Sequence, residues 1–292
     1  MSSISRFLLD RVDRALQWAV AQLAGTDEAS RAAKMLLAHV LGCTLEGILI
    51  RPERVLQEEE ARAYQSLVAR RARHEPVAYL VGHRAFMDLD LIVDQRVLIP
   101  RPETELLAEQ AIAIAGRWPV VSLADVGTGS GAIAVALAVH LPHSRVFATD
   151  VSADALSVAR INAARYGVAQ RITFLQGDLL SPLPEPVHLI VANLPYISES
   201  ELERLPSDIR LYEPRRALVA GAEGLDAIGA LLAAAGRYLT EEGAILLEIG
   251  ATQGQKVCRL ARQALPGAHV QVIQDYASFD RMVCVALQKK RG

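Results

Sequence analysis

The sequence predicts an α/β fold: a mostly parallel sheet covered by helices on both faces, preceded by a small helical domain. Strand-like and helix-like segments alternate from Val120 onward, whereas the first 80 or so residues show helical spacing alone. A segment with alternating apolar residues lies between these two regions. Strand–helix alternation specifies a parallel sheet between helical layers. We therefore expect a helical domain over residues 1–83, a β-hairpin linker over 84–100 and an α/β domain over 101–292.

Three helices are expected in the first domain. Apolar residues recur at helical spacing in Ser3–Leu23 and in Ala29–Leu41, and Glu58–Arg73 forms a third helix that ends before Pro76. The third helix carries Arg62, Arg70, Arg71 and Arg73. These arginines form either a partner-binding face or an ordinary solvated face of the helix.

The linker is expected to be a hairpin. Apolar residues alternate from Arg84 to Leu98, with a turn expected near Asp94–Gln95. The segment Ile99–Glu105 follows, and its two prolines fix an extended backbone. Thr104 is then expected to cap a helix that runs to Ala115.

Strands and helices alternate in the rest of the chain. The expected strands are Val120–Val126, Arg145–Asp150, Ile172–Gln176, Val187–Ala192, Ala244–Ile249, His269–Tyr276 and Met282–Leu287. The expected helices are Ala132–His140, Ala153–Gly167, Leu225–Tyr238 and Gln253–Ala264. Parallel strands need a long crossover, and only Ala277–Arg281 joins the last two strands. This pair should therefore be antiparallel.

Composition narrows the class of function. The 292 residues are 51% hydrophobic with a net charge of −2, so the chain lacks the basic signature of a dedicated nucleic-acid binder. The three cysteines lie far apart without metal-ligand spacing, and no metal is expected. The longest apolar run, Gly131–Leu141, is too short to span a bilayer. We expect a cytoplasmic protein without direct nucleic-acid or membrane contact.

A glycine-rich loop follows the first strand of the α/β domain and opens a helix. It comprises Gly127, Thr128, Gly129, Ser130 and Gly131. Glycines permit a tight turn and close backbone approach to a ligand, and a helix N-terminus attracts an anionic group. In a site for S-adenosyl-L-methionine that group is the methionine carboxylate. Gly127, Gly129 and Ala132 also satisfy the dinucleotide fingerprint, so an NAD site remains an alternative.

Two acidic residues stand at the ends of the next strands. Asp150 ends the second strand, where a carboxylate binds ribose hydroxyls. Asp178, followed by Leu179, is placed to contact an adenine amino group. The alternatives are a helix cap for Asp150 and a turn residue for Asp178.

The segment Asn193-Leu194-Pro195-Tyr196 ends the fourth strand, where ligands of such sheets bind. Methyl transfer to a planar amide or amino nitrogen needs acceptors that hold its two N–H groups. The Asn193 side-chain oxygen and the Leu194 carbonyl are the expected acceptors, and Pro195 restricts the backbone. Tyr196 can pack against the flat substrate group. No general base is needed, because a methylated, protonated amide is very acidic. The alternative is a strand followed by a plain proline turn.

These residues resemble the HemK/PrmC family of protein-(glutamine-N5) methyltransferases. Ile99–Glu105 matches its Ile-Pro-Arg-Pro-Glu-Thr-Glu motif, while Glu75–Gly82 and the later segments around Glu213–Leu218 and Gly221–Leu225 are similar to family segments. The resemblance runs from about residue 10 to 287. It implies a class I, Rossmann-like sheet that uses S-adenosyl-L-methionine and releases S-adenosyl-L-homocysteine.

The resemblance also implies a substrate and its site. The family methylates the glutamine of the Gly-Gly-Gln loop in peptide chain release factors, and its N-terminal domain contacts the factor. Asn193, Pro195 and Tyr196 are then catalytic, and we expect a monomer. Arg101 and Glu103 are expected to shape the pocket wall, the alternative being a purely structural turn.

One residue departs from the family pattern. The family usually has proline where this chain has Leu194, and Asn-Leu-Pro-Tyr is frequent in ribosomal-RNA adenine dimethyltransferases. An adenine N6-methyltransferase acting on RNA or DNA is therefore the second hypothesis. An NAD-binding oxidoreductase and a non-catalytic binding protein with this fold are the others.

Overall fold

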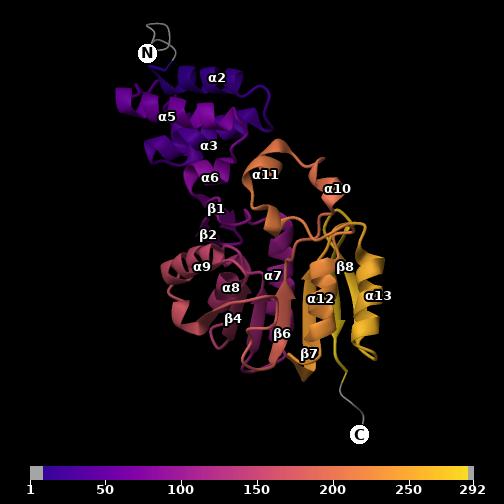
Figure 1. Cartoon of the computed structure of the whole chain (residues 1–292). Coiled ribbons are helices and arrows are strands. Elements are labelled where there is room, and N and C mark those ends of the chain that lie inside the picture. The colour runs from indigo at the N-terminus through magenta and orange to yellow at the C-terminus, as the bar shows by residue number, and fades with distance from the viewer. Residues whose placement is uncertain (1–8, 289–292) are drawn as a thin grey trace. The chain divides into compact units, whose positions relative to one another are not determined.

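The computed structural model describes residues 9–288, which fall into two compact units (Figure 1). Unit 1 comprises the chain up to Gly82 together with Pro206–Tyr212. Unit 2 comprises His83–Leu205 and the chain from Glu213 onward. The division differs from the expected domains in two respects: the hairpin belongs to unit 2, and a short segment of the later chain belongs to unit 1.

Unit 1 is built from short helices around one apolar core. They are α2 (Val12–Gln22), α3 (Ala29–Leu41), α4 (Leu45–Ile50), α5 (Glu58–Arg71) and α6 (Val77–Val81). The start of the expected helix Ser3–Leu23 lies outside the described residues. Tyr64 is fully buried among these helices, and its hydroxyl donates a hydrogen bond of 2.9 Å to the Ala33 carbonyl. Gly42 ends α3 in the left-handed conformation.

The arginines of α5 do not share one surface. Arg71 is only 5% exposed and donates to the carbonyls of His74 and Glu75. Arg70 pairs with the buried Glu75 carboxylate. The expectation of a common binding or solvated face was therefore wrong for Arg71. Its buried guanidinium bonds to carbonyls of the segment that directly follows α5.

The segment inserted into unit 1 contains α11 (Ser207–Tyr212). The Tyr212 hydroxyl donates a 2.8 Å hydrogen bond to the Arg73 carbonyl, and the Asp208 carboxylate lies 3.7 Å from the Arg71 guanidinium. The chain thus leaves unit 2 after Leu205, contributes one helix to unit 1, and returns at Glu213.

The hairpin consists of β1 (His83–Phe86) and β2 (Leu89–Ile92), paired antiparallel. The turn expected near Asp94–Gln95 is present, since the Val97 N–H donates to the Asp94 carbonyl at 3.1 Å, but it lies beyond β2 and does not join the hairpin strands. The hairpin itself turns at Met87–Asp88. The sequence signal was the three-residue step from Phe86 to Leu89, which breaks the alternation and leaves a two-residue loop. Met87 takes a positive φ of 52° in this turn.

Unit 2 contains a seven-stranded sheet in the order β5-β4-β3-β6-β7-β9-β8. The strands are β3 (Ser122–Val126), β4 (Arg145–Asp150), β5 (Ile172–Gln176), β6 (Val187–Ala192), β7 (Leu239–Glu248), β8 (His269–Gln274) and β9 (Asp280–Ala286). The first five named are parallel, and β9 runs antiparallel to both β7 and β8. The expected antiparallel last pair is confirmed.

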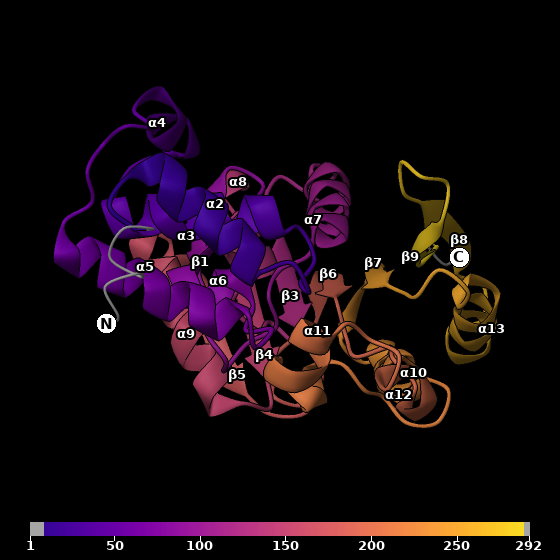
Figure 2. The same ribbon diagram turned by 90° about the horizontal axis from the view of Figure 1, so that it is seen from above.

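Two apolar layers cover the sheet. The helices of unit 2 are α7 (Pro102–Ala115), α8 (Ala132–His140), α9 (Ala153–Arg165), α10 (Glu199–Leu202), α12 (Asp226–Ala235) and α13 (Gly254–Ala264), with short 3-10 turns η1 (Ala169–Arg171) and η2 (Arg215–Ala217). Leu189 and Val191 of β6 pack with α7 and α8, whereas Ile190 and Ala192 pack with α12 and α13. Figure 2 shows α7 and α12 on opposite sides of the central strands.

The start of α7 differs from the prediction. Pro102 occupies the first turn and Arg101 is the N-cap, so Thr104 lies inside the helix and caps nothing. Proline favours the first helical position, because its missing N–H would have no intrahelical partner there. The Thr104 hydroxyl is therefore available for contacts outside α7.

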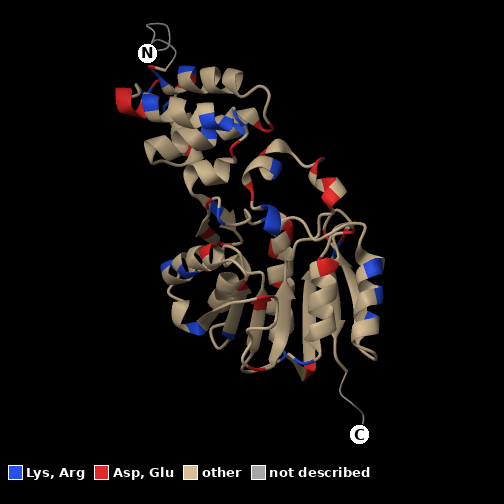
Figure 3. Cartoon of the chain, viewed as in Figure 1, with Lys and Arg blue, Asp and Glu red and all other residues tan. Residues whose placement is uncertain are grey.

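Charges of both signs are interspersed over each unit, in agreement with the near-neutral net charge (Figure 3). Within residues 9–288, no helix is both long and apolar enough to cross a bilayer. The same residues hold no cluster of three or more His, Cys, Asp or Glu side chains suited to a metal ion.

Candidate functional site

A cavity of about 400 Å³ opens at the carboxyl ends of β3, β4 and β6. Predicted site residues that line it are Gly127, Gly129, Asp150, Asp178, Leu179, Asn193, Leu194 and Pro195. The strand order reverses between β3 and β6, which is the switch point where such sheets bind ligands. The volume lies in the range of small-molecule pockets. Two glycines of the loop and residues 193–195 after β6 therefore border one cavity, whereas Tyr196 does not line it.

The backbone of the loop explains its glycines. Gly127, Gly129 and Gly131 have φ angles of 76°, 55° and 80°, a region that side chains disfavour. A Cβ on Gly131 would lie 3.0 Å from the Ala159 Cβ, so only glycine lets the loop approach α9 this closely. A Cβ on Gly129 would meet no other protein atom nearer than 4.0 Å. Gly129 is therefore a place where the backbone itself borders the cavity.

Three predicted loop contacts have a different position. Thr128, Ser130 and Gly131 are not among the residues that line the cavity. The Thr128 hydroxyl donates to the buried Asp125 carboxylate at 2.6 Å, and the same Asp125 oxygen accepts the Ala134 N–H at 3.0 Å. Burial raises the pKa of Asp125 to about 7. These contacts hold the loop against the first turn of α8.

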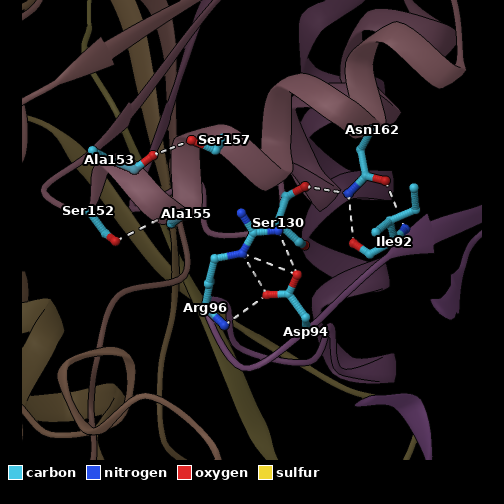
Figure 4. A network of polar contacts seen from close by, with 9 residues as sticks. All are labelled: Ile92, Asp94, Arg96, Ser130, Ser152, Ala153, Ala155, Ser157 and Asn162. Atoms are coloured by element: carbon cyan, nitrogen blue, oxygen red, sulfur yellow. Dashed lines mark hydrogen bonds and ion pairs between the residues drawn. The ribbon is translucent and has the colours of Figure 1, made fainter. Parts of the chain in front are cut away.

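A second network ties the loop to the hairpin (Figure 4). Asn162 of α9 donates to the carbonyls of Ser130, at 2.8 Å, and Ile92, at 2.9 Å, and accepts the Ile92 N–H at 2.8 Å. Its buried amide thus joins the glycine loop and the end of β2. Beyond β2, Asp94 pairs with Arg96, which also lines the cavity. The segment that follows the hairpin, and not the hairpin itself, contributes to the cavity wall.

The two predicted acidic residues both line the cavity. Asp150 accepts the Gly129 N–H at 2.9 Å and, through its other oxygen, the Ser152 N–H at 2.8 Å. Its carboxylate therefore contacts the loop and also the start of α9. Leu179 takes a positive φ of 46°, and its carbonyl accepts a hydrogen bond from the Thr149 hydroxyl. This bond anchors the turn that carries Asp178.

Two buried residues fix the Asn193 amide: Thr104 contacts it directly, and Glu248 acts through Thr104. Its Nδ2 donates to the Thr104 Oγ1 at 2.9 Å, and Thr104 Oγ1 donates to the Glu248 Oε2 at 2.7 Å. Thr104 and Glu248 are 4% and 1% exposed. Burial is the largest cause that raises the pKa of Glu248, to about 7. The Asn193 side chain is thus fixed on its amino side.

Tyr196 is anchored at both ends. Its hydroxyl lies 3.4 Å from Glu248 Oε1, and its carbonyl accepts the Gln253 amide at 3.0 Å. Burial raises the pKa of the Tyr196 phenol, with Glu248 as the next cause, so this group stays protonated. A Cβ on Gly224 would lie only 2.1 Å from the Tyr196 carbonyl oxygen. Only glycine at position 224 lets the backbone pass this close to the Tyr196 carbonyl.

Arg101 and Glu103 do not line the cavity. The Arg101 guanidinium donates to the Glu213 carboxylate at 2.5 Å, and Glu213 also accepts the Ile99 N–H at 3.2 Å. Glu213 directly precedes Pro214, which does line the cavity. Arg101 is thus linked to the cavity wall only through Glu213. Glu103 is exposed and lies near Glu248 and Tyr196.

The sequence reasoning missed Glu248, Gln253 and the role of Thr104. Leu247 of β7 pairs with Ala192 of β6. The residues that follow them, Glu248 and Asn193, therefore lie side by side at the carboxyl edge of the sheet. The rule that ligands bind at strand ends applied to Glu248 as much as to Asn193. Nothing local in the sequence marked Thr104 or Gln253.

Fold and site together define the class. A parallel sheet with a reversed strand near its end, a glycine loop after β3 and Asn-Leu-Pro-Tyr after β6 are those of an α/β, Rossmann-like methyltransferase of the S-adenosylmethionine-dependent class. Residues 123–211 match the family model described as "Methyltransferase domain", and residues 14–82 match the "PrmC N-terminal domain".

Comparison with curated proteins identifies the family. The chain is 44% identical to "Release factor glutamine methyltransferase" of Moorella thermoacetica, over 92% of this chain and 95% of the other. It is 42% identical to the protein of that name from Chlorobaculum tepidum, over 89% and 91%. The chain belongs to the release factor glutamine methyltransferase family.

A solved structure supports the fold alone. "Crystal structure of Methyltransferase from Pyrococcus furiosus" aligns with a TM-score of 0.53 at 16% identity and covers 75% of this chain and 98% of that one.

Proposed function

We propose that this protein transfers a methyl group from S-adenosyl-L-methionine to the side-chain amide nitrogen of the glutamine in the Gly-Gly-Gln motif of peptide chain release factors. The observation that carries the proposal is the fixed Asn193 amide at the edge of the cavity, in a chain that matches enzymes of that name over nearly its whole length. The proposed catalytic residues are Asn193, Pro195 and Tyr196.

The cavity fits S-adenosyl-L-methionine. Left-handed glycines give an open backbone cradle at the N-terminus of α8, which suits the methionine carboxylate. Asp150 and Asp178 stand at the ends of neighbouring strands, suited to the ribose hydroxyls and the adenine amino group. When bound, the cofactor would supply an electrophilic methyl group.

The chain's own residues would orient the acceptor amide. Asn193 Nδ2 is taken up by Thr104, so Oδ1 is the atom left to accept an N–H of the substrate. The Leu194 carbonyl would accept the other N–H, because Pro195 keeps residue 194 extended. Tyr196, held by Glu248 and Gln253, would pack against the planar amide. These contacts restrict the approach of the nitrogen.

The N-terminal domain would recognise the protein substrate. In this proposal residues 1–83 form the substrate-recognition domain, 84–100 the linker and 101–292 the catalytic domain. The N-terminal family match covers residues 14–82, in support of a separate module. A release factor is a cytoplasmic translation protein, so the enzyme would work in the cytoplasm, as a monomer and without direct contact to nucleic acid.

The test is incubation with labelled S-adenosyl-L-methionine and a purified release factor, followed by mass mapping of the Gly-Gly-Gln peptide. One methyl group on that glutamine is expected. The matched control is the same factor with alanine in place of the glutamine, which should take no label. An unmodified factor, in a preparation shown to bind the cofactor, would contradict the proposal. Label on bare ribosomal RNA alone would instead favour adenine as the acceptor.

A further inference from the structure

We propose that Thr104 and Glu248 are positioning residues that determine which atom of the Asn193 amide faces the acceptor. The inference rests on the proposed function, because it assigns Asn193 Oδ1 to the substrate amide. It concerns residues from three separate segments: the first turn of α7, the end of β7 and the residue after β6.

The direction of each hydrogen bond follows from chemistry. Thr104 Oγ1 donates to Glu248 Oε2, 2.7 Å away. The ionised carboxylate can only accept, and the protonated acid keeps Oε2 as an acceptor when its proton is on Oε1, the oxygen that faces the Tyr196 hydroxyl. The Thr104 hydroxyl has then used its only proton, and it can only accept from Asn193, 2.9 Å away. The group that faces Thr104 is therefore the NH2 of Asn193. Oδ1 is turned to the other side.

Without this relay the amide has no fixed polarity. Rotation by 180° exchanges the oxygen and the NH2 of an asparagine side chain at almost no cost in shape. In the wrong orientation, an N–H donor would face the N–H donors of the substrate amide, and the acceptor would be lost. The relay excludes this orientation, since it would place Oδ1 against a Thr104 oxygen without a free proton.

Burial and backbone geometry make the relay rigid. Thr104 is 4% and Glu248 is 1% exposed, so water competes little for their bonds. Ala192 and Leu247 are paired across β6 and β7, which places the following residues, Asn193 and Glu248, at the same edge. Pro102 fixes the start of α7 and thereby the position of Thr104.

Glu248 also links the amide to the aromatic ring. Its second oxygen, Oε1, lies 3.4 Å from the Tyr196 hydroxyl, which is therefore a weaker second contact. One buried carboxylate thus contacts Thr104, which supports Asn193, and also the Tyr196 hydroxyl directly. Thr104 contacts Asn193 but not Tyr196, so a change at Thr104 tests the orientation of Asn193 better than a change at Glu248 does.

The test compares three variants with the wild type in steady-state methylation of a release factor. Thr104→Val keeps the shape and removes the hydroxyl, and kcat should fall about 10- to 100-fold, the size of effect that misorientation produces. The KM for the factor and the cofactor Kd, measured by calorimetry, should stay unchanged. Thr104→Ser keeps the hydroxyl and should restore most of kcat.

Thr240→Val is the matched control. Thr240 lies near the opposite end of β7, and its hydroxyl is buried without a hydrogen-bond partner. Replacement of this threonine by valine should leave the kcat of the enzyme at the wild-type level. Wild-type kcat in Thr104→Val would overturn the inference, as would an equal loss in Thr104→Ser. An inactive wild type that still binds the cofactor would instead contradict the proposed function.

Discussion

The Arg101 guanidinium donates a 2.5 Å hydrogen bond to the Glu213 carboxylate across 112 positions of the chain. Glu213 is 6% exposed and also accepts the Ile99 N–H. The proline-rich segment before α7 is thereby joined to the loop that continues into the cavity wall at Pro214. Two segments that lie far apart in the sequence are thus in direct contact in the fold.

Arg101→Ala should destabilise unit 2 by about 3 kcal/mol, because it removes the cationic partner of a buried carboxylate. Urea denaturation followed by circular dichroism measures the change. Arg215→Ala is the matched control: its partner Glu199 is exposed, and an exposed ion pair contributes roughly 1 kcal/mol or less. Equal losses in the two variants would show that Arg101 is an ordinary surface cation.

Asn193→Ala should reduce methyl transfer by about 100- to 1,000-fold, the effect of losing an oriented polar group at a reacting centre. Cofactor binding should remain measurable, because the glycine loop, Asp150 and Asp178 are untouched. Single-turnover kinetics with a saturating release factor would separate the chemical step from binding. Turnover at the wild-type rate would refute the role assigned to Asn193.

Gly129→Val should abolish cofactor binding while the protein stays folded. A Cβ at residue 129 would have the Gly127 carbonyl oxygen, 4.0 Å away, as its nearest neighbour, so the valine side chain would enter the cavity. Calorimetric titration with S-adenosyl-L-methionine measures the loss. Cofactor affinity equal to the wild type would show that the backbone at residue 129 does not border the ligand.

Two other glycines provide the controls for this variant. Gly167→Val introduces the same strain at a φ of 66° with no neighbour within 4 Å, and it should leave cofactor affinity unchanged. Gly131→Val should instead lower stability, because its Cβ would lie 3.0 Å from Ala159. A loss of binding in all three variants would point to strain and not to filling of the cavity.

Periodicity in the sequence was enough to predict most of unit 2. The strands β4, β5 and β6 and the helix α8 have the predicted bounds, because their apolar runs are set off by glycine, proline or polar residues. Polar Thr240-Glu241-Glu242-Gly243 concealed the first half of β7. Helices of only four to six residues, such as α10 and α11, contain too few turns for a periodic signal.

The site was predictable only where local sequence carries the chemistry. The glycine loop and Asn193–Tyr196 are contiguous motifs, and the cavity brings most of their residues together. Thr104 and Glu248 are 144 positions apart, and their bond depends on the packing of α7 over β7. Single-sequence reasoning cannot pair such residues. The same holds for Gln253, whose amide reaches the Tyr196 carbonyl 57 positions away.

Glu248 should make stability fall as pH rises. Burial raises its pKa from the ordinary 4.5 to about 7, opposed by Thr104, Arg281 and Tyr196 and reinforced by Glu103. The folded state therefore holds the Glu248 proton between these pH values, whereas the unfolded state releases it. The stability linked to this proton is fully present below pH 4.5 and is lost as pH rises through 7.

Glu248→Gln isolates this effect, because glutamine resembles the protonated acid and does not titrate. Asp125, whose pKa burial also raises, is present in both proteins and cancels in the difference. From pH 4.5 to above 7, the free energy of unfolding of the variant should gain on that of the wild type. The gain should be on the order of 3 kcal/mol, from about 1.4 kcal/mol per pKa unit. Urea denaturation of both proteins at a series of pH values measures it. A difference that stays constant over this range would mean that Glu248 is already ionised at acid pH, held by Thr104 and Arg281 more strongly than burial opposes it.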